Sequence, residues 1–175
     1  MRLTVYTDYS LRVLMYIAAR PEPLPTIPII AASYGVSRNH LVKIVHQLGV
    51  MGYLTTVRGK GGGLRLARAA KSIVIGDVVR NTEPDLALVP CFEPINADCV
   101  ITPGCKLRKS LFEARDAFLT VLDRYTLADL TTNASTLSSL LAANGPATGM
   151  QVLRPKLQRD SRRIAKGPRG AGIRR

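Results

Sequence analysis

The first half of the chain repeats apolar residues three or four positions apart, which is the spacing of amphipathic helices. This spacing predicts one helix over residues 7–20 with Thr7 as N-cap, a second that begins after Thr26 and ends at Gly35, and a third capped by Ser37. The third helix gathers its apolar residues on one face, at Leu41, Ile44, Val45, Leu48 and Met51.

After the third helix the pattern changes to that of β-strands. Residues 53–57 are rich in β-forming side chains, residues 58–63 make a glycine-rich basic turn, and residues 64–67 alternate again. This order predicts a β-hairpin with a basic tip. Three helices followed by such a hairpin predict a winged helix-turn-helix, which places its third helix in the major groove of DNA.

A second part of the chain contains a longer helix. Residues 75–82 predict a short helix, residues 84–104 a loop, and residues 105–125 a helix whose apolar residues are alternately four and three apart: Leu107, Leu111, Ala114, Phe118, Val121 and Tyr125. That spacing is a heptad seam. Part of the seam must pack on its own domain, and the rest would lie open to water unless a second copy covers it, so we expect a homodimer.

The predicted fold class is mainly α with a small β-hairpin wing. We expect a winged helix-turn-helix DNA-binding domain over residues 1–83, and a cysteine-containing loop with a dimerisation helix over residues 84–132. Residues 133–175 are rich in small and then basic residues, and we expect a disordered basic tail there.

The net charge of +13 is distributed unevenly. Residues 1–70 contain nine Lys and Arg against two acidic residues, residues 71–147 seven against nine, and residues 148–175 nine against one. A purely solubilising charge would be spread more evenly. A basic segment followed by a near-neutral one is expected when one part of a fold meets the phosphates of double-stranded DNA and another meets protein.

The chain lacks any stretch approaching the roughly 20 uncharged apolar residues that a membrane-spanning helix needs. Its N-terminus also lacks the basic-then-apolar order of a signal peptide. We therefore expect a cytoplasmic protein with no membrane partner.

The first residues of the third helix are the candidates for reading base edges. Arg38 can donate two hydrogen bonds to guanine, and Asn39 can pair with adenine in the same way. His40 is a weaker candidate that could simply lie at the helix edge, and Lys43 is expected to meet phosphate.

The hairpin tip offers two further DNA contacts. Arg58 and Lys60 would reach the DNA backbone or the minor groove, and the glycines around them permit close approach. The alternative is an ordinary exposed hairpin, but its position directly after the third helix favours a contact with DNA.

Three cysteines, Cys91, Cys99 and Cys105, fall within fifteen residues. Three thiols cannot all form disulfides, and intracellular thiols stay reduced, so a metal or a cluster is the leading interpretation. The spacing of the cysteines alone supports a zinc ion and an iron-sulfur cluster almost equally. A fourth ligand is missing nearby, because His40 and His46 lie in the predicted reading helix. The prolines and the glycine of the segment suit a loop that wraps a larger group.

Six blocks of sequence stand out together: TDYSLR (7–12), YGVSRNHLVK (34–43), VRGKGGG (57–63), IGDVVR (75–80), CVITPGC (99–105) and YTLADL (125–130). With these blocks the chain resembles, over residues 1–132, a family of winged-helix regulators with iron-sulfur clusters, to which nitric-oxide-sensing repressors and cluster-assembly regulators belong. Two departures are Ser10, where the family has glycine, and the basic tail, which is either an added DNA arm or a solvated segment.

The resemblance implies a homodimeric repressor, not an enzyme, that binds a palindromic operator and senses nitric oxide. It implies a cluster, 2Fe-2S or 4Fe-4S, on Cys91, Cys99 and Cys105. In related proteins an acidic residue from the first helix of the partner subunit completes the coordination, and Asp8 stands at the matching place. The alternative for Asp8 is a first-turn acid that stabilises the helix dipole, and both roles are compatible.

Three alternatives remain open. The nearest is a regulator of the same fold that senses iron or cluster supply, which chelation rather than nitric oxide would release. An electron carrier with a small cluster is a less favoured alternative, because a carrier does not need a basic reading helix and wing. A structural zinc site is the third, and it would leave the purified protein colourless.

Overall fold

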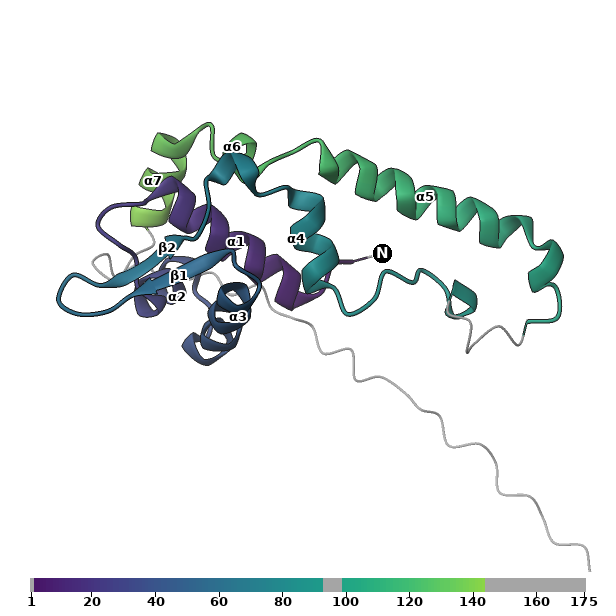
Figure 1. Cartoon of the computed structure of the whole chain (residues 1–175), viewed down its shortest axis with the longest axis horizontal. Coiled ribbons are helices and arrows are strands. Elements are labelled where there is room, and N and C mark those ends of the chain that lie inside the picture. Colours follow the sequence, from purple (N-terminus) through teal and green to yellow (C-terminus); the bar gives the residue numbers. More distant parts are fainter. Residues whose placement is uncertain (1, 93–98, 144–175) are drawn as a thin grey trace, which may run out of the picture.

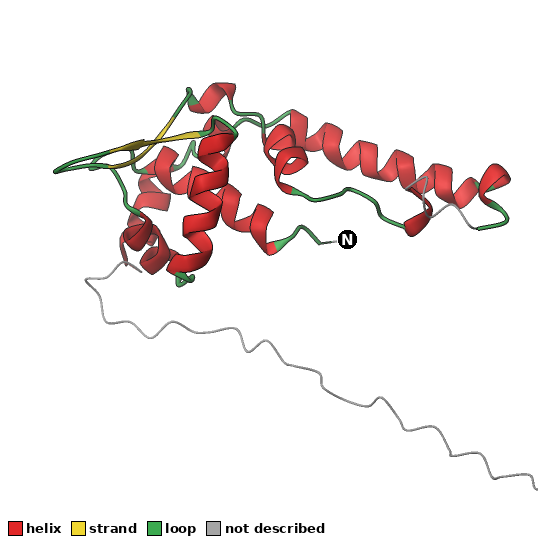
Figure 2. Cartoon of the chain, turned by 60° about the horizontal axis from the view of Figure 1, so that its bottom comes forward, coloured by secondary structure: helices red, strands yellow, loops and turns green. Residues whose placement is uncertain are grey.

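The computed structural model describes residues 2–92 and 99–143. Figure 2 shows that this part of the chain is mainly helical, with a single hairpin of strands. The helical elements are α1 (Val5–Ala19), α2 (Ile27–Tyr34), α3 (Arg38–Val50), η1 (Ala70–Ser72), α4 (Ile75–Thr82), η2 (Pro90–Phe92), η4 (Thr102–Gly104), α5 (Lys106–Asp123), α6 (Leu127–Leu130) and α7 (Ala134–Ala143). The strands are β1 (Leu54–Val57) and β2 (Gly63–Leu66).

Helix α1 begins one turn earlier than the sequence predicts. Its N-cap is Thr4, whose hydroxyl accepts a hydrogen bond from the Thr7 backbone N at 3.2 Å, so the prediction of Thr7 as N-cap is wrong. Thr7 is instead fully buried inside the helix. The reason is that Thr4 offers the same capping oxygen three residues upstream, and Val5 and Tyr6 continue the helix. Asp8 still lies in the first turn.

Helices α2 and α3 form as predicted and enclose the core of the DNA-binding half. Gly35 ends α2 with a left-handed φ of 63°, which a glycine adopts without strain. The apolar face of α3 is buried against α1 and α2. The largest fully buried side chains are Tyr16, Tyr53, Leu14, Ile17, Ile30, Leu41, Leu48, Ile73, Leu127, Val13, Val78 and Val79.

The predicted hairpin is confirmed as an antiparallel pair with Leu54 opposite Leu66 and Val57 opposite Gly63. Its base is fixed to the loop before α2, because the Leu64 N–H donates to the Pro25 carbonyl at 2.8 Å. A Cβ at Gly63 would overlap the Pro25 carbonyl, so this close approach requires glycine.

Helix α5 extends away from the DNA-binding half, and the preceding loop runs outward beside it (Figure 1). The chain returns at the end of α5 and rejoins the DNA-binding half through an isolated bridge between Val74 and Thr126. The Leu127 N–H donates to the Ile73 carbonyl at 2.8 Å in the same place. The fold therefore fixes one end of α5 firmly and carries the cysteine loop at the other.

Helix α7 corrects the prediction of a disordered tail from residue 133. Residues 134–143 form a helix that packs on α1 and α2, with Leu141 only 8% exposed in the core. The sequence did not predict this helix because the segment consists mostly of Ala, Ser and Thr, and only a few leucines form its apolar side. Residues 144–175 lie outside the described residues. No helix in residues 2–92 and 99–143 is long and apolar enough to cross a membrane.

Candidate DNA-binding surface and cysteine site

The first turn of α3 presents the predicted base-reading side chains to solvent. Arg38, Asn39 and His40 are its first three residues, and all three are exposed, as is Lys43 one turn later. The opposite face of α3 is held in the core by its buried apolar residues, including Leu41. The exposed turn is thus a rigid feature that can enter a groove of DNA.

The wing adds a second basic element next to α3. Arg58 and Lys60 are exposed at its tip, between residues whose backbone includes Gly59 at φ 96° and Gly61 at φ 78°. Sequence analysis missed Arg65, which is exposed on β2 and donates to Thr55 Oγ1 at 3.3 Å across the hairpin. The alternation of apolar and polar residues over positions 64–67 could have predicted that Arg65 is exposed.

The sequence that forms this basic surface is poor in opposing charge, because residues 23–76 contain no acidic residue, and Glu22 lines one pocket together with Arg65. Helix α3 and β1 pack together, so the reading turn and the wing belong to one rigid unit. A predominantly positive surface of this kind attracts the phosphates of DNA.

The cysteines lie in the loop before α5 and at its first turn. Cys91 is half-buried in η2, Cys99 is exposed, and Cys105 is the half-buried N-cap of α5; all three are free thiols. The Cys105 sulfur accepts a hydrogen bond from the Arg108 backbone N at 3.3 Å.

Within one described chain the cysteines are not drawn together into a ligand shell. No three His, Cys, Asp or Glu side chains among residues 2–92 and 99–143 are placed to hold a metal ion. The donor set still fits a thiolate-bound group, since three free soft ligands share one loop. Thr102 Oγ1, between Cys99 and Cys105, is buried without a hydrogen-bond partner. This hydroxyl is therefore available for a hydrogen bond to a group bound in the loop.

Two stacked rings fasten the first part of the loop to α5. Phe92 and Phe112 stack with centroids 3.8 Å apart and planes 4° from parallel. The Arg115 guanidinium lies over both rings, 5.4 Å from the Phe92 centroid and 4.7 Å from that of Phe112. The chain next to Cys91 is thereby held against the helix that Cys105 begins.

Asp8 lies on α1, in the DNA-binding half, and its carboxylate accepts a hydrogen bond from Arg12 Nε at 2.9 Å. The Arg12 guanidinium also lies near the rings of Tyr9 and Tyr34, and Tyr34 Oη donates to the Arg12 carbonyl. Burial raises the pKa of Tyr34 to about 12, so this hydroxyl keeps its proton. Asp8 remains 44% exposed and therefore accessible to a second molecule.

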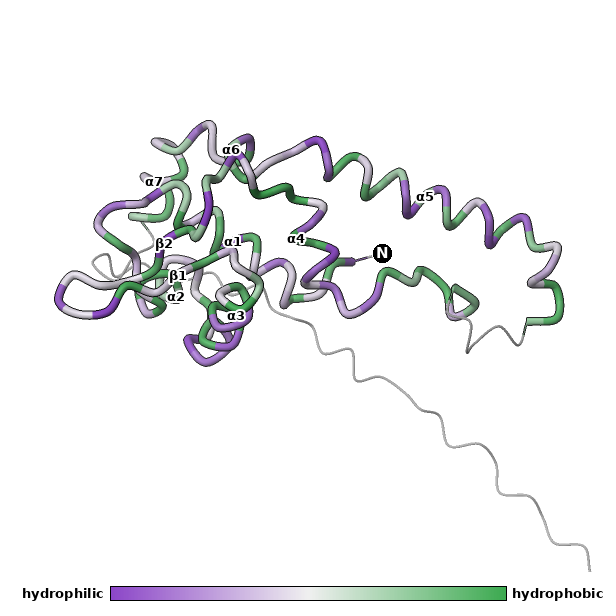
Figure 3. The backbone as a smooth tube through the Cα atoms, in the orientation of Figure 1, coloured by the Kyte–Doolittle hydropathy of each residue, from purple (hydrophilic) through white to green (hydrophobic). Residues whose placement is uncertain are grey.

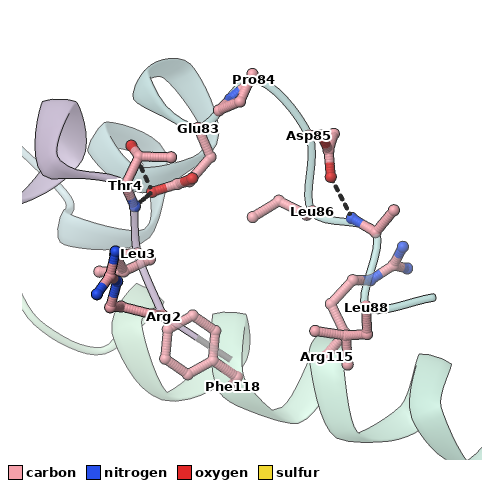
Figure 4. Close-up of a pocket in the computed structure, with 11 residues that line it drawn as sticks. Arg2, Leu3, Thr4, Glu83, Pro84, Asp85, Leu86, Leu88, Arg115 and Phe118 are labelled. Carbon is pink, nitrogen blue, oxygen red and sulfur yellow. Dashed lines mark hydrogen bonds between the residues drawn. The ribbon is translucent and has the colours of Figure 1, made fainter. Parts of the chain in front are cut away.

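A cleft of about 300 Å3 separates the DNA-binding half from α5. Figure 4 shows Thr4 and Glu83 joined on one wall, where the Glu83 carboxylate accepts from the Thr4 backbone N at 2.8 Å, and Phe118 and Arg115 on the α5 side. Phe118 belongs to the predicted heptad seam. One seam residue therefore faces its own chain, as the sequence analysis expected for part of the seam.

Most of the remaining seam is exposed. Leu107 is 66% exposed, Val121 44% and Tyr125 47%, and the cysteine loop adds exposed Val100 and Ile101. In Figure 3 the tube of α5 changes repeatedly between hydrophobic and hydrophilic colour along its length. An apolar stripe of this length next to an apolar loop is a surface suited to protein contact.

A winged helix-turn-helix with an exposed basic reading turn defines a DNA-binding transcriptional regulator. The Rrf2 family, described as iron-dependent transcriptional regulators, matches residues 3–133 of the chain. The protein belongs to this family, and it is a regulator rather than an enzyme.

Named relatives agree with the family. The HTH-type transcriptional regulator NsrR of Geobacillus kaustophilus is 53% identical over 142 residues, which cover 81% of this chain and 97% of the relative. The regulator of the same name from Bacillus subtilis is 51% identical over the same shares. The structure of CymR, the global cysteine regulator of B. subtilis, superposes with a TM-score of 0.62 at 26% identity, covering 76% of this chain and 98% of CymR.

Proposed function

We propose that the protein is a homodimeric repressor that holds an iron-sulfur cluster on Cys91, Cys99 and Cys105 and releases its operator when nitric oxide attacks that cluster. The observation that carries this proposal is the placement of three free thiols in one loop at the end of α5 far from the DNA-binding half. The resemblance of six sequence blocks and the NsrR name of the relatives support the choice of signal.

Three thiolates suit either a zinc ion or an iron-sulfur cluster. The resemblance of the six sequence blocks is what favours the cluster. The resemblance makes Asp8 of the partner subunit the proposed fourth ligand, and the Asp8 side chain, 44% exposed on α1, is accessible to a second molecule. A bound cluster supplies iron that reacts with nitric oxide.

The homodimer would form along the exposed seam of α5. Leu107, Val121 and Tyr125 would pack against the same residues of a second copy, and Val100 and Ile101 would be covered with them. Such a dimer presents two reading turns to a palindromic operator, whose half-sites lie about 34 Å apart.

The chain itself provides the connection between the cysteines and the reading turn. Cys105 begins α5, and the other end of α5 is joined to α4 by the ion pair between Arg80 and Asp123. Helix α4 packs on α1, which packs on α3. If Asp8 of one subunit no longer bound the cluster of the other, this series of helix contacts would no longer be linked to the partner subunit. A full reversal from 1:99 to 99:1 between free and bound operator needs about 5.5 kcal/mol of difference between the two states.

One other function has a specific observation in its favour. The family is described as iron-dependent, which fits a site that reports iron or cluster supply. The two functions predict different fast triggers of operator release. Nitric oxide should act faster on a nitric oxide sensor, and iron chelation should act faster on a sensor of iron or cluster supply.

Purification without oxygen tests the proposal. The wild type should be coloured and contain iron and sulfide, and Cys99→Ser should lose most of both because a hydroxyl is a poor ligand for this cluster. Ser110→Ala, an exposed change on α5 near the loop, is the matched control and should keep wild-type iron. Colourless wild type with zinc, or full iron and sulfide in Cys99→Ser, would contradict the proposed ligand set.

A further inference from the structure

Arg108 contacts both of the cysteines that bound the loop. Its side-chain Nε donates to the Cys91 carbonyl at 2.9 Å, and its backbone N donates to the Cys105 sulfur at 3.3 Å. The guanidinium also lies 4.8 Å from the centroid of the Phe112 ring. One residue in the first turn of α5 therefore fixes two points that are fourteen positions apart in the chain.

The surroundings of Arg108 keep its side chain in this place. Phe112 lies one turn further along α5 and stacks on Phe92, the neighbour of Cys91. Arg115 covers the same pair of rings and is paired with Asp116 at 2.7 Å. Arg115 donates to Asp116 and, within the described residues, not to a cysteine, so the two arginines share the ring stack but differ in their contact with the loop ends.

We infer that Arg108 is a positioning residue for the cysteine site, which sets the distance between Cys91 and Cys105 before any cluster binds. This inference rests on the proposed function for its purpose but not for its geometry. The fixed positive charge of Arg108 would also stabilise a site that gathers thiolates.

The apo protein provides the first test, which needs no cluster. Peptide mapping measures the rate at which a maleimide modifies each cysteine of the reduced, folded chain. Arg108→Ala should make Cys91 react about fivefold faster, since one charged hydrogen bond no longer holds its backbone. Cys99 should keep its rate. Arg115→Ala is the matched control and should change the Cys91 rate less than about twofold.

The loaded protein provides the second test. The wild-type cluster should be lost to a chelator several times more slowly than that of Arg108→Ala. Arg108→Lys keeps the charge but loses the forked donor, and its rate should lie between the two. Equal thermal midpoints would show that all variants fold.

The outcomes separate the two ideas. Wild type that takes up no iron would overturn the proposed function, and the maleimide rates would still decide the role of Arg108. Wild type that holds a cluster, together with Arg108→Ala that reacts at Cys91 and loses its cluster at wild-type rates, would overturn this inference alone.

Discussion

Arg80 and Asp123 form a forked ion pair that joins α4 to the last turn of α5, with Nη2 to Oδ2 at 2.6 Å and Nη1 to Oδ1 at 2.7 Å. Gly76, one turn earlier on α4, allows this approach, because a Cβ there would overlap Asp123 Oδ1. The pair connects the helix that begins at Cys105 to the DNA-binding half. We therefore expect changes at this junction to affect both stability and communication.

The first prediction concerns pH. Hydrogen bonds from Arg80 lower the pKa of Asp123 in the folded protein. A lowered pKa stabilises the fold above the unfolded value of about 3.9, and this contribution is lost as pH falls through the lower folded value. Asp123→Asn should reduce the thermal midpoint at pH 6, and the difference from wild type should shrink toward zero as the pH approaches 2.5. A constant difference over this range would show that the charge of Asp123 is not the cause.

The second prediction uses glycine substitutions. Gly76→Ala should destabilise the protein by about 1–3 kcal/mol in denaturant unfolding, because the new Cβ must displace the carboxylate of Asp123. Gly49→Ala is the matched control on α3, where a Cβ would meet only the Leu54 carbonyl at 3.9 Å. That change should be neutral or stabilising by up to about 1 kcal/mol. Equal effects at both positions would contradict the proposed crowding.

The third prediction separates base reading from phosphate binding. Arg38→Ala should weaken binding to the operator about 5- to 150-fold and weaken binding to unrelated DNA much less, because a bidentate base contact is lost. Arg58→Ala should weaken both kinds of DNA by the same factor and reduce the salt slope by about one. Competition titrations measure both ratios, and a uniform loss in Arg38→Ala would make Arg38 a phosphate contact.

The fourth prediction tests the dimer. Val121→Lys places a charge on the exposed seam and should raise the dimer dissociation constant more than about tenfold in sedimentation experiments. Thr120→Lys introduces the same charge on the neighbouring, exposed position outside the seam and should change it less than about twofold. Two monomeric variants, or two unaffected dimers, would contradict an interface along this stripe.

The sequence was sufficient for the DNA-binding half because local signals agree there. Gly35, Ser37 and the glycine-rich turn predict the ends of α2, α3 and the hairpin, and the structure confirms them. Two boundaries failed for physical reasons. The sequence analysis placed the cap of α1 at Thr7, and only the folded chain shows that the accepting oxygen belongs to Thr4. Helix α7 depends on tertiary burial of Leu141, which composition does not reveal.

The candidate sites were predictable in part. Exposure of Arg38 and Asn39 in the first turn of α3 follows from the helical period, and the structure shows it. Their contacts with bases stay a prediction. Arg108 was missed because its hydrogen bond to Cys91 joins residues 17 positions apart, and no spacing rule links them. The ligand role of Asp8 stays a prediction, since it needs a second copy of the chain.

Operator affinity before and after nitric oxide tests the central claim most directly. The full-length protein, purified without oxygen and loaded with its cluster, should bind its operator tightly and lose affinity by about 100-fold or more when nitric oxide is added. Cys99→Ser should show a weak affinity that nitric oxide does not change. An operator affinity that is the same with and without nitric oxide in the cluster-loaded wild type would contradict the account.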